Sequence, residues 1–307
     1  MWWRRLLPPE MLAAAAPLTS GVPFSPNPID DLQILFQFEF MRNAYIAGTA
    51  AAIAAGLVGY FVVLRSLSFA AHTLTQIGFA GATGALAAAV NPLYGLLLIN
   101  AIGAGVIGAW GRRERGRDVV TGIVLTSALG LGLLFLTFSH SPEAVPVLVG
   151  DVLGISATEV LITVVATALI VVAVALMYKP LLFATLDEEI AEARGVRVVL
   201  VSVLLLGVLA ITTSVATPIV GVLLTYAILV GPAATAAQLS ARPGRAVALS
   251  VALSVAYMWI GLAVSYWIDF PPSVFVTGLA FAGYLAARSA HALSHSRLAL
   301  SLHVPAA

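Results

Sequence analysis

Long apolar segments, separated by short polar ones, constrain the fold of this chain more than any other feature. Nine such runs follow one another, at about 43–64, 72–90, 93–110, 119–138, 158–178, 198–215, 218–239, 245–268 and 273–288. A helix needs about 20 apolar residues to cross the hydrocarbon core of a bilayer. Only 9% of the 307 residues are charged, against about 25% in soluble domains. The sequence therefore predicts an all-α integral membrane protein, a polytopic bundle of about nine transmembrane helices.

The apolar runs also divide the chain into three parts. We expect an N-terminal tail and interfacial helix over 1–41, a transmembrane domain over 42–290, and a C-terminal tail over 291–307. Asn27-Pro28 has the form of a helix start, and the apolar residues that follow it lie near one stripe, as in a helix that rests on a membrane surface. These lengths leave no room for a second large soluble domain.

The basic residues indicate how the helices are oriented. Strict alternation of nine spans places twelve of the fifteen Lys and Arg residues on the same side as the Arg-rich segment 111–118. Cytoplasmic loops of membrane proteins carry such an excess of positive charge. The sequence thus predicts a multi-pass protein with its amino terminus outside the cell and its carboxyl terminus in the cytoplasm.

The composition excludes several kinds of chemistry. The chain has no cysteine, which rules out a disulfide, a thiolate metal site and a cysteine nucleophile. Its single lysine, Lys179, lies in Tyr-Lys-Pro, so the phosphate-binding loop of ATPases is not present. A net charge of +1, from scattered arginines, gives no nucleic-acid footprint. We expect the chain itself to bind neither a cofactor nor nucleic acid, and to contact membrane lipid.

A charged island interrupts the apolar runs over 179–197. Thr185 and Glu188 have the spacing of a capping box, and Gly195 can close a helix in a left-handed turn. This pattern predicts a short amphipathic helix that lies across the membrane surface. An ordinary helix within a loop would fit the same pattern.

The short helix would present two different faces. Leu186, Ile190 and Ala193 fall on one side, which we expect to point at the ends of neighbouring helices. The charged residues, which we expect to face water, are Asp187, Glu188, Glu189, Glu192 and Arg194. A soluble partner could push on such a helix and so move the helices beneath it.

His72 lies at the start of the second apolar run, and Gln76 is one helical turn further on the same face. An ionisable group at this depth is expensive to bury and usually functional. An imidazole nitrogen and an amide oxygen can face a cation or a polar solute, and a symmetric dimer would supply both twice. An interfacial histidine beside a packed glutamine is the alternative interpretation.

Two further features are less specific. Asp151 lies in the longest external loop, 139–157, where it could help to receive a cation or contact an external binding protein, or could simply be solvated. Gly231-Pro232 lies inside the run 218–239 and should kink that helix, because proline removes a backbone donor. A packing irregularity would look the same.

Four stretches, in order, resemble the permease subunits of zinc- and manganese-type ABC importers. They are Leu64–Gly81, Val149–Gly154, Leu186–Val196 and Val220–Ala236. The first is similar to the family's first cytoplasmic turn and second helix, the second to its external Gly-Asp segment, and the third to its coupling helix. The fourth resembles the most specific stretch of the family. The resemblance covers about residues 43–288.

The resemblance implies a homodimeric or paired permease in a prokaryotic plasma membrane. It also implies two cytoplasmic ATPase subunits that bind ATP, an external metal-binding protein, and a divalent cation, zinc or manganese, as the transported substrate. Family members often carry an Asp and a His one turn apart where this chain has His72 and Gln76. The missing carboxylate weakens the attraction for a divalent ion.

The sequence therefore predicts the membrane-spanning permease subunit of an ATP-driven ABC importer for zinc, manganese or a related cation, and not an enzyme. It would work by alternating access, with ATPase closure transmitted through 185–195. An ABC permease for a non-metal solute is the first alternative. An ion-driven secondary transporter is the second, but it needs carboxylates for ion coupling, and the predicted spans contain none well inside.

Overall fold

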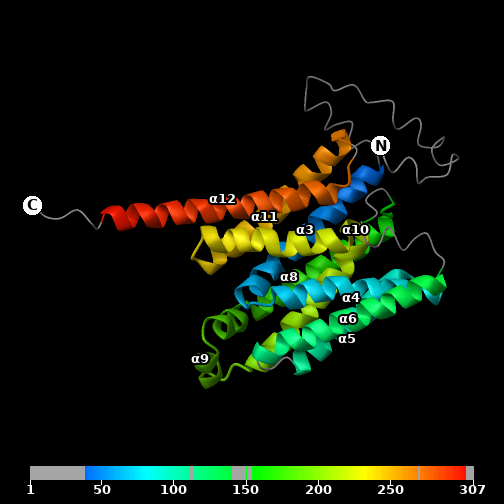
Figure 1. Cartoon of the computed structure of the whole chain (residues 1–307), viewed down its shortest axis with the longest axis horizontal. Helices are drawn as coiled ribbons and strands as arrows, with labels where there is room; N and C mark the ends of the chain where they lie inside the picture. Colours follow the sequence, from blue (N-terminus) through cyan, green and yellow to red (C-terminus); the bar gives the residue numbers. More distant parts are fainter. Residues whose placement is uncertain (1–38, 111–113, 140–149, 151–153, 269, 302–307) are drawn as a thin grey trace, which may run out of the picture.

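Nine helices make up the part of the chain that the structure, a computed structural model, describes, which is residues 39–110, 114–139, 150, 154–268 and 270–301. They are α3 (Glu39–Leu64), α4 (Ser68–Ala87), α5 (Pro92–Trp110), α6 (Glu114–Ser139), α8 (Ala157–Leu186), α9 (Glu188–Ala193), α10 (Val198–Leu239), α11 (Pro243–Ile268) and α12 (Pro272–Ser301). Figure 1 shows the long helices side by side, with α9 at one end of the bundle. These described residues contain no strand, and the all-α prediction is confirmed.

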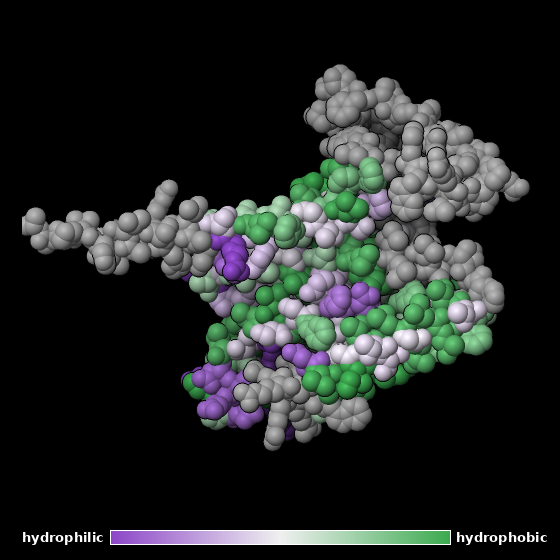
Figure 2. Space-filling view, in the orientation of Figure 1, coloured by the Kyte–Doolittle hydropathy of each residue, from purple (hydrophilic) through white to green (hydrophobic). Residues whose placement is uncertain are grey.

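Seven of the described helices are long and apolar enough to cross a membrane. α4, with 20 residues, falls outside this group, and most of its residues are buried among the other helices. Apolar side chains cover much of the face seen in Figure 2. Exposed leucines on α8 include Leu161, Leu169 and Leu176. Such a surface suits contact with lipid tails rather than with water.

α10 is 42 residues long, which would give a straight helix of about 63 Å, roughly twice the thickness of a bilayer core. The backbone avoids this length because it leaves helical geometry at Gly221, where φ is +81°. That value lies in the left-handed region, which favours glycine. The sequence predicted two separate runs here, 198–215 and 218–239. The structure places the break between them at Gly221, inside the second run. Gly231 and Pro232 lie in the second half of α10, where no such departure occurs.

The direction of each half of α10 can be found by comparison with α4 and α5, which pack against each other. Gly81, late in α4, lies against the backbone of Gly95, early in α5, with no room for a side chain at either position. Ile77, earlier in α4, packs on Gly103, later in α5. The two helices are therefore antiparallel and in close backbone contact.

The first half of α10 runs antiparallel to α5. Val203 packs on Gly108, near the end of α5. Further along α10, Ser214 Oγ donates a hydrogen bond to the carbonyl oxygen of Leu96, near the start of α5, at 3.1 Å. This half of α10 is consequently parallel to α4.

The second half of α10 runs in the opposite direction. Val222, directly after the break, belongs to a buried cluster with Phe79 of α4. Tyr226 lies four residues later and contacts His72, which is nearer the start of α4. The chain thus reverses at Gly221, and α10 supplies two of the predicted membrane segments.

A buried asparagine connects α5 to the first half of α10. Asn100 Nδ2 donates hydrogen bonds to Ser214 Oγ at 2.9 Å and to Thr213 Oγ1 at 3.3 Å. Gly78 of α4 faces the same amide, so the three helices meet at this point. Polar side chains at membrane depth hold helices together in this way, because lipid offers them no other partner.

Several connections meet at the end of the bundle that carries α9. Phe61, near the end of α3, contacts the ring of Tyr178 in α8, with 6.0 Å between ring centroids. The Tyr178 hydroxyl in turn lies close to Gly244 at the start of α11. Residues predicted to share one side of the membrane, such as Arg65 and Arg245, flank these contacts. α12 continues to Ser301, past the boundary at 290 expected from the sequence.

Candidate functional site

The short helix α9 lies across the end of the bundle and is joined to it by an ion pair. Arg65, in the turn between α3 and α4, donates from Nη2 to Glu188 Oε1 at 3.2 Å. The same Nη2 donates to Ser202 Oγ of α10 at 2.8 Å. One guanidinium group therefore contacts α9 and α10 from the α3–α4 turn.

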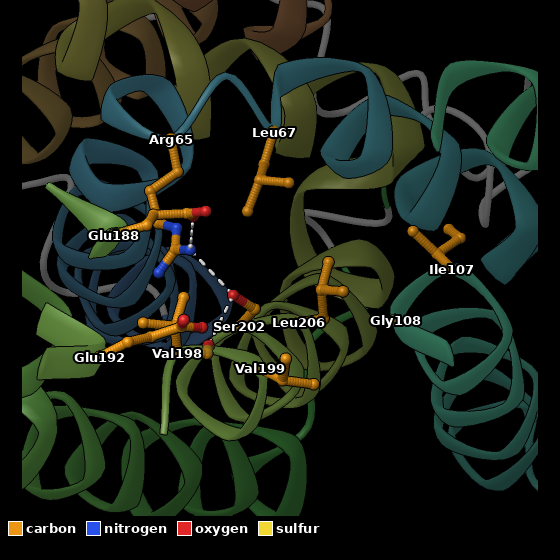
Figure 3. Close-up of a pocket in the computed structure, with 10 residues that line it drawn as sticks. All are labelled: Arg65, Leu67, Ile107, Gly108, Glu188, Glu192, Val198, Val199, Ser202 and Leu206. Atoms are coloured by element: carbon orange, nitrogen blue, oxygen red, sulfur yellow. Dashed lines mark hydrogen bonds and ion pairs between the residues drawn. The ribbon is translucent and has the colours of Figure 1, made fainter. Parts of the chain in front are cut away.

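A pocket of about 180 Å³ opens beside this ion pair. It lies between α9, the α3–α4 turn, the end of α5 and the start of α10 (Figure 3). Its polar lining comes from Arg65, Glu188, Glu192 and Ser202, and the remainder is apolar. The pocket separates α9 from the end of α5 and from Leu67 in the α3–α4 turn, so α9 has room to shift against the bundle.

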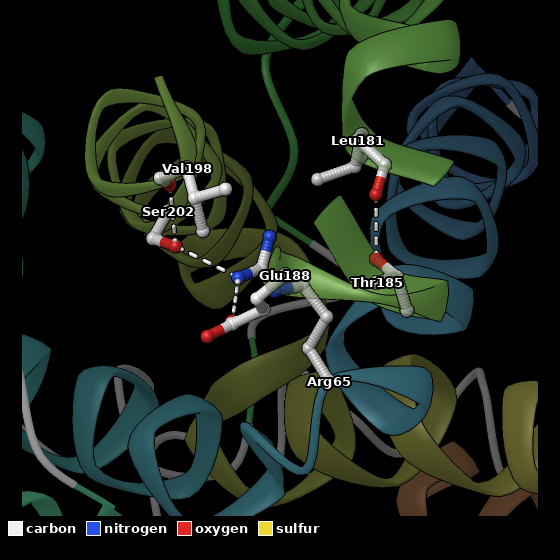
Figure 4. Close-up of polar contacts among 6 residues, drawn as sticks. All are labelled: Arg65, Leu181, Thr185, Glu188, Val198 and Ser202. Carbon is white, nitrogen blue, oxygen red and sulfur yellow. Dashed lines mark hydrogen bonds and ion pairs between the residues drawn. The ribbon is translucent and has the colours of Figure 1, made fainter. Parts of the chain in front are cut away.

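The start of α9 differs from the predicted capping box. Thr185 is still within α8, and its Oγ1 donates to the carbonyl oxygen of Leu181 at 2.6 Å (Figure 4). The N-cap is Asp187, which has extended backbone angles and accepts a hydrogen bond at Oδ1 from the backbone N–H of Ile190 at 2.9 Å. The prediction was wrong because Thr185 is satisfied by its own helix, which leaves the cap to the first residue that leaves helical geometry.

The end of α9 agrees with the sequence. Gly195 follows the helix with φ of +82°, the left-handed turn that was predicted. Arg194 is the C-cap, and its guanidinium carbon lies 5.8 Å from the ring centroid of Phe183 in α8. The last turn of α9 is thereby held next to the end of α8.

The predicted inner face of α9 in fact points away from the bundle. Leu186 is 68% exposed and Ile190 is 53% exposed, and Ala193 is exposed as well. The residue that packs on the bundle is Ala191, which is 1% exposed. A small side chain allows the backbone of α9 to lie close to the bundle, so the larger apolar side chains are left on the outer surface. Glu189 is exposed there too.

The second candidate site lies on α4. His72 and Gln76 are both half-buried. His72 Nδ1 is buried and has no hydrogen-bond partner among the described residues. The ring of Tyr226 meets the imidazole edge-on. The structure thus brings His72 next to an aromatic residue that sequence reasoning did not single out, although Tyr226 lies inside the most specific of the four resembling stretches.

The described residues contain no group of three or more His, Asp or Glu side chains that could hold a metal ion. His72 and Gln76 of one chain would give a cation at most two side-chain ligands, and a second copy or the backbone would have to supply the others. Asp151, the third predicted metal residue, lies outside the described residues.

At the opposite end of the bundle, a glycine contacts the break in α10. Gly150 has φ of +90°, and its α-carbon lies against Val220 and Gly221 so closely that a side chain would collide with their backbone atoms. Gly150 of the predicted external Gly-Asp segment therefore packs on the point where α10 reverses. Gly231, where a kink was expected, lies against Ala280 of α12 instead, and Pro232 is buried in the same half of α10.

Known proteins resemble this chain over most of its length. It is 28% identical over 237 residues to the manganese transport system membrane protein MntC of Listeria monocytogenes, which covers 76% of this chain and 85% of MntC. It is 26% identical over 241 residues to the high-affinity zinc uptake system membrane protein ZnuB of Buchnera aphidicola, covering 77% of this chain and 92% of ZnuB.

A solved structure and a family profile agree with these relatives. The structure of PsaBC from Streptococcus pneumoniae in complex with Fab superposes with a TM-score of 0.75 at 26% identity, over 84% of this chain and 93% of the other. The profile of the ABC 3 transport family matches residues 37–290. This match spans most of the chain and includes both candidate sites. The chain therefore belongs to the ABC 3 transport family.

Proposed function

We propose that this chain is the permease subunit of an ATP-driven importer of a divalent metal cation, manganese or zinc, that works by alternating access. Membership of the family makes it a membrane-spanning ABC transporter permease rather than an enzyme. The names of the relatives, a manganese and a zinc transport protein, support a metal substrate.

The observation that carries the proposal is the position of α9. This helix presents Ile190 outward at one end of the bundle, next to the equally exposed Leu186 at the end of α8, and its Glu188 contacts the turn that precedes α4. Exposed apolar side chains on a charged helix suit docking into a groove of a soluble protein. The partner that fits is a cytoplasmic ATPase subunit, whose closure would press on α9.

His72 and Gln76 would meet the cation on its path. A neutral imidazole nitrogen is a ligand for both zinc and manganese, and Nδ1 of His72 is not engaged by another group among the described residues. A pathway residue must release the ion as well as bind it, so two neutral ligands per chain suit passage better than storage. A second copy of the permease would bring the number of such ligands to four.

The remaining partners follow from this arrangement. Two ATPase subunits would bind the α9 helices of two permease copies, and an external metal-binding protein would deliver the ion at the opposite end, near Gly150. In this orientation α9 and the carboxyl terminus face the cytoplasm, and the amino terminus lies outside the prokaryotic plasma membrane. The excess of basic residues on the α9 side supports that orientation.

The proposal is tested by transport in a defined system. The permease is reconstituted into liposomes with its ATPase and its external binding protein, and uptake of radioactive manganese and zinc is measured with and without ATP. We expect ATP-dependent uptake of at least one of the two metals. If ATP is hydrolysed but neither metal is taken up, the result would contradict a metal substrate and favour a permease for a non-metal solute.

A further inference from the structure

The role of the nearly buried Arg65 side chain does not follow from the family match or from the names of the relatives. Its side chain is 7% exposed, whereas that of its partner Glu188 is 66% exposed. Figure 4 shows the guanidinium group reaching from the α3–α4 turn toward both α9 and α10. A nearly buried arginine that binds a mostly exposed glutamate makes the bundle side of this contact the fixed one and the α9 side the adjustable one.

The contact with α10 fixes the arginine further. Ser202 Oγ accepts from Arg65 Nη2 and donates its own hydrogen to the carbonyl oxygen of Val198 at 2.9 Å. The serine hydroxyl is therefore used in both directions, and its rotation is restricted. Hydrogen bonds that involve a charged group are stronger than neutral ones, so the buried contact of Arg65 with Ser202 is the firm part of a chain that links α9, the α3–α4 turn and α10.

The turn that carries Arg65 is short and leads directly into α4. Ser66 has φ of +54°, and the backbone N–H of Leu67 donates to the carbonyl oxygen of Val62 at 2.8 Å. α4 then begins at Ser68, and His72 is its fifth residue. A non-glycine residue in the left-handed region is tolerated only where its surroundings hold it, so this turn is a rigid connection rather than a flexible one.

We propose that Arg65 is the positioning residue that passes movement of α9 to α4, and thereby sets the position of His72 during transport. Pressure on α9 displaces the Glu188 carboxylate, Arg65 follows it, and the rigid turn moves the first turn of α4. Ala191 packs α9 on the bundle but forms no polar link to the α3–α4 turn. The inference rests on the proposed docking of an ATPase at α9, and it assigns the step that follows docking.

The first test compares Glu188→Gln with Asp118→Asn, which removes an exposed carboxylate at the start of α6. Both variants are reconstituted with the ATPase, and metal uptake is divided by ATP hydrolysed. We expect Glu188→Gln to lower this ratio by roughly fivefold or more, the lower range of coupling between two sites, while the ATPase still co-purifies. Asp118→Asn should keep the parental ratio.

Ser202→Ala provides an independent variant, because it alters the other partner of Arg65 and leaves α9 untouched. This variant should also lower the ratio of metal uptake to ATP hydrolysed. The double variant Glu188→Gln/Ser202→Ala should lower it by less than the product of the two single effects, because both act through one guanidinium group. A parental ratio in Glu188→Gln, or fully independent effects in the double variant, would overturn the proposal.

A second measurement separates this inference from the transport proposal. The chain has no cysteine, so a single cysteine placed at exposed Phe69, in the first turn of α4, reports movement through its rate of reaction with a thiol reagent. ATP should change that rate in the otherwise unaltered complex and should no longer change it in Glu188→Gln. This result would support the role of Arg65 even if neither manganese nor zinc were transported. An ATP response of equal size in both proteins would refute it.

Discussion

The ring of Tyr226 meets the imidazole of His72 edge-on, with 4.9 Å between the ring centroids and 72° between the ring planes. Tyr226 lies five residues after the reversal of α10 at Gly221, so His72, which we propose to meet the cation, is packed against the segment that begins at the break. The Gly150 contact reaches the same break from the other end of the bundle. Any shift of the second half of α10 must therefore alter the surroundings of His72.

His72→Ala should reduce ATP-dependent metal uptake on the order of tenfold or more while protein abundance stays at the parental level, because it removes an imidazole ligand from the path. Uptake into liposomes and the yield of purified protein provide the two measurements. Tyr226→Phe is the matched control, since it preserves the ring contact with His72 and should transport at close to the parental rate. Parental uptake by His72→Ala would identify His72 as an interfacial residue only.

Gln76→His should make the permease retain metal more strongly, because it adds a nitrogen ligand one helical turn from His72. Stronger retention slows release, so we expect more metal bound to the purified protein and a lower maximal rate of uptake. Metal analysis after gel filtration and initial uptake rates check the two expectations. Unchanged metal content would place Gln76 away from the path of the ion.

Ile190→Asp should weaken binding of the ATPase subunit about tenfold, as expected when an apolar contact near the centre of an interface is lost. Ile190 is exposed on the outer side of α9, so the substitution should leave insertion and folding of the permease intact. Co-purification of the ATPase measures the effect. Asp118→Asn, which changes an exposed carboxylate of α6 rather than of α9, should bind the ATPase normally, and normal binding by Ile190→Asp would contradict the docking surface.

The sequence was sufficient for the class of fold and for the location of α9, but not for the details of that helix. Apolar runs and clusters of basic residues can be recognised in the sequence without knowledge of the fold. A glycine directly after a helix likewise predicts the left-handed backbone angle found at Gly195. The cap at Asp187 and the outward direction of Leu186 depend on how α8 ends and on how close Ala191 allows α9 to approach. Such relationships between distant elements leave no local pattern.

Arg65 and Tyr226 could not be identified as site residues for the same reason. Arg65 follows an apolar run, where a basic residue is normally explained by its position at the membrane surface. Its role depends on Glu188 and Ser202, which lie 123 and 137 residues away in sequence. A tyrosine in an apolar run is ordinary, and only the reversal at Gly221 places Tyr226 beside His72.

The two ends of the bundle should lie on opposite sides of the membrane. Single cysteines in this cysteine-free chain, one replacing Glu189 in α9 and one replacing Ala89 in the exposed turn between α4 and α5, can be tested with a thiol reagent that does not cross membranes. We expect Ala89→Cys to react in intact cells and Glu189→Cys to react only after the cells are opened. The reverse result would contradict the orientation with α9 in the cytoplasm.

Gly221→Ala should destabilise the protein by about 1–3 kcal/mol, because φ of +81° with ψ of 160° is a combination that essentially only glycine adopts. Gly207→Ala is the matched control, because Gly207 lies in the same helix with open space around the position of a side chain. Alanine favours a helix over glycine by about 1 kcal/mol, so Gly207→Ala should be neutral or slightly stabilising. Thermal unfolding of the two variants in detergent measures the contrast.

Gly221→Ala should also lower metal uptake more than its loss of stability explains, because a strained break would shift Tyr226 against His72. Equal stability of the two variants would show that α10 does not require a left-handed residue at its reversal.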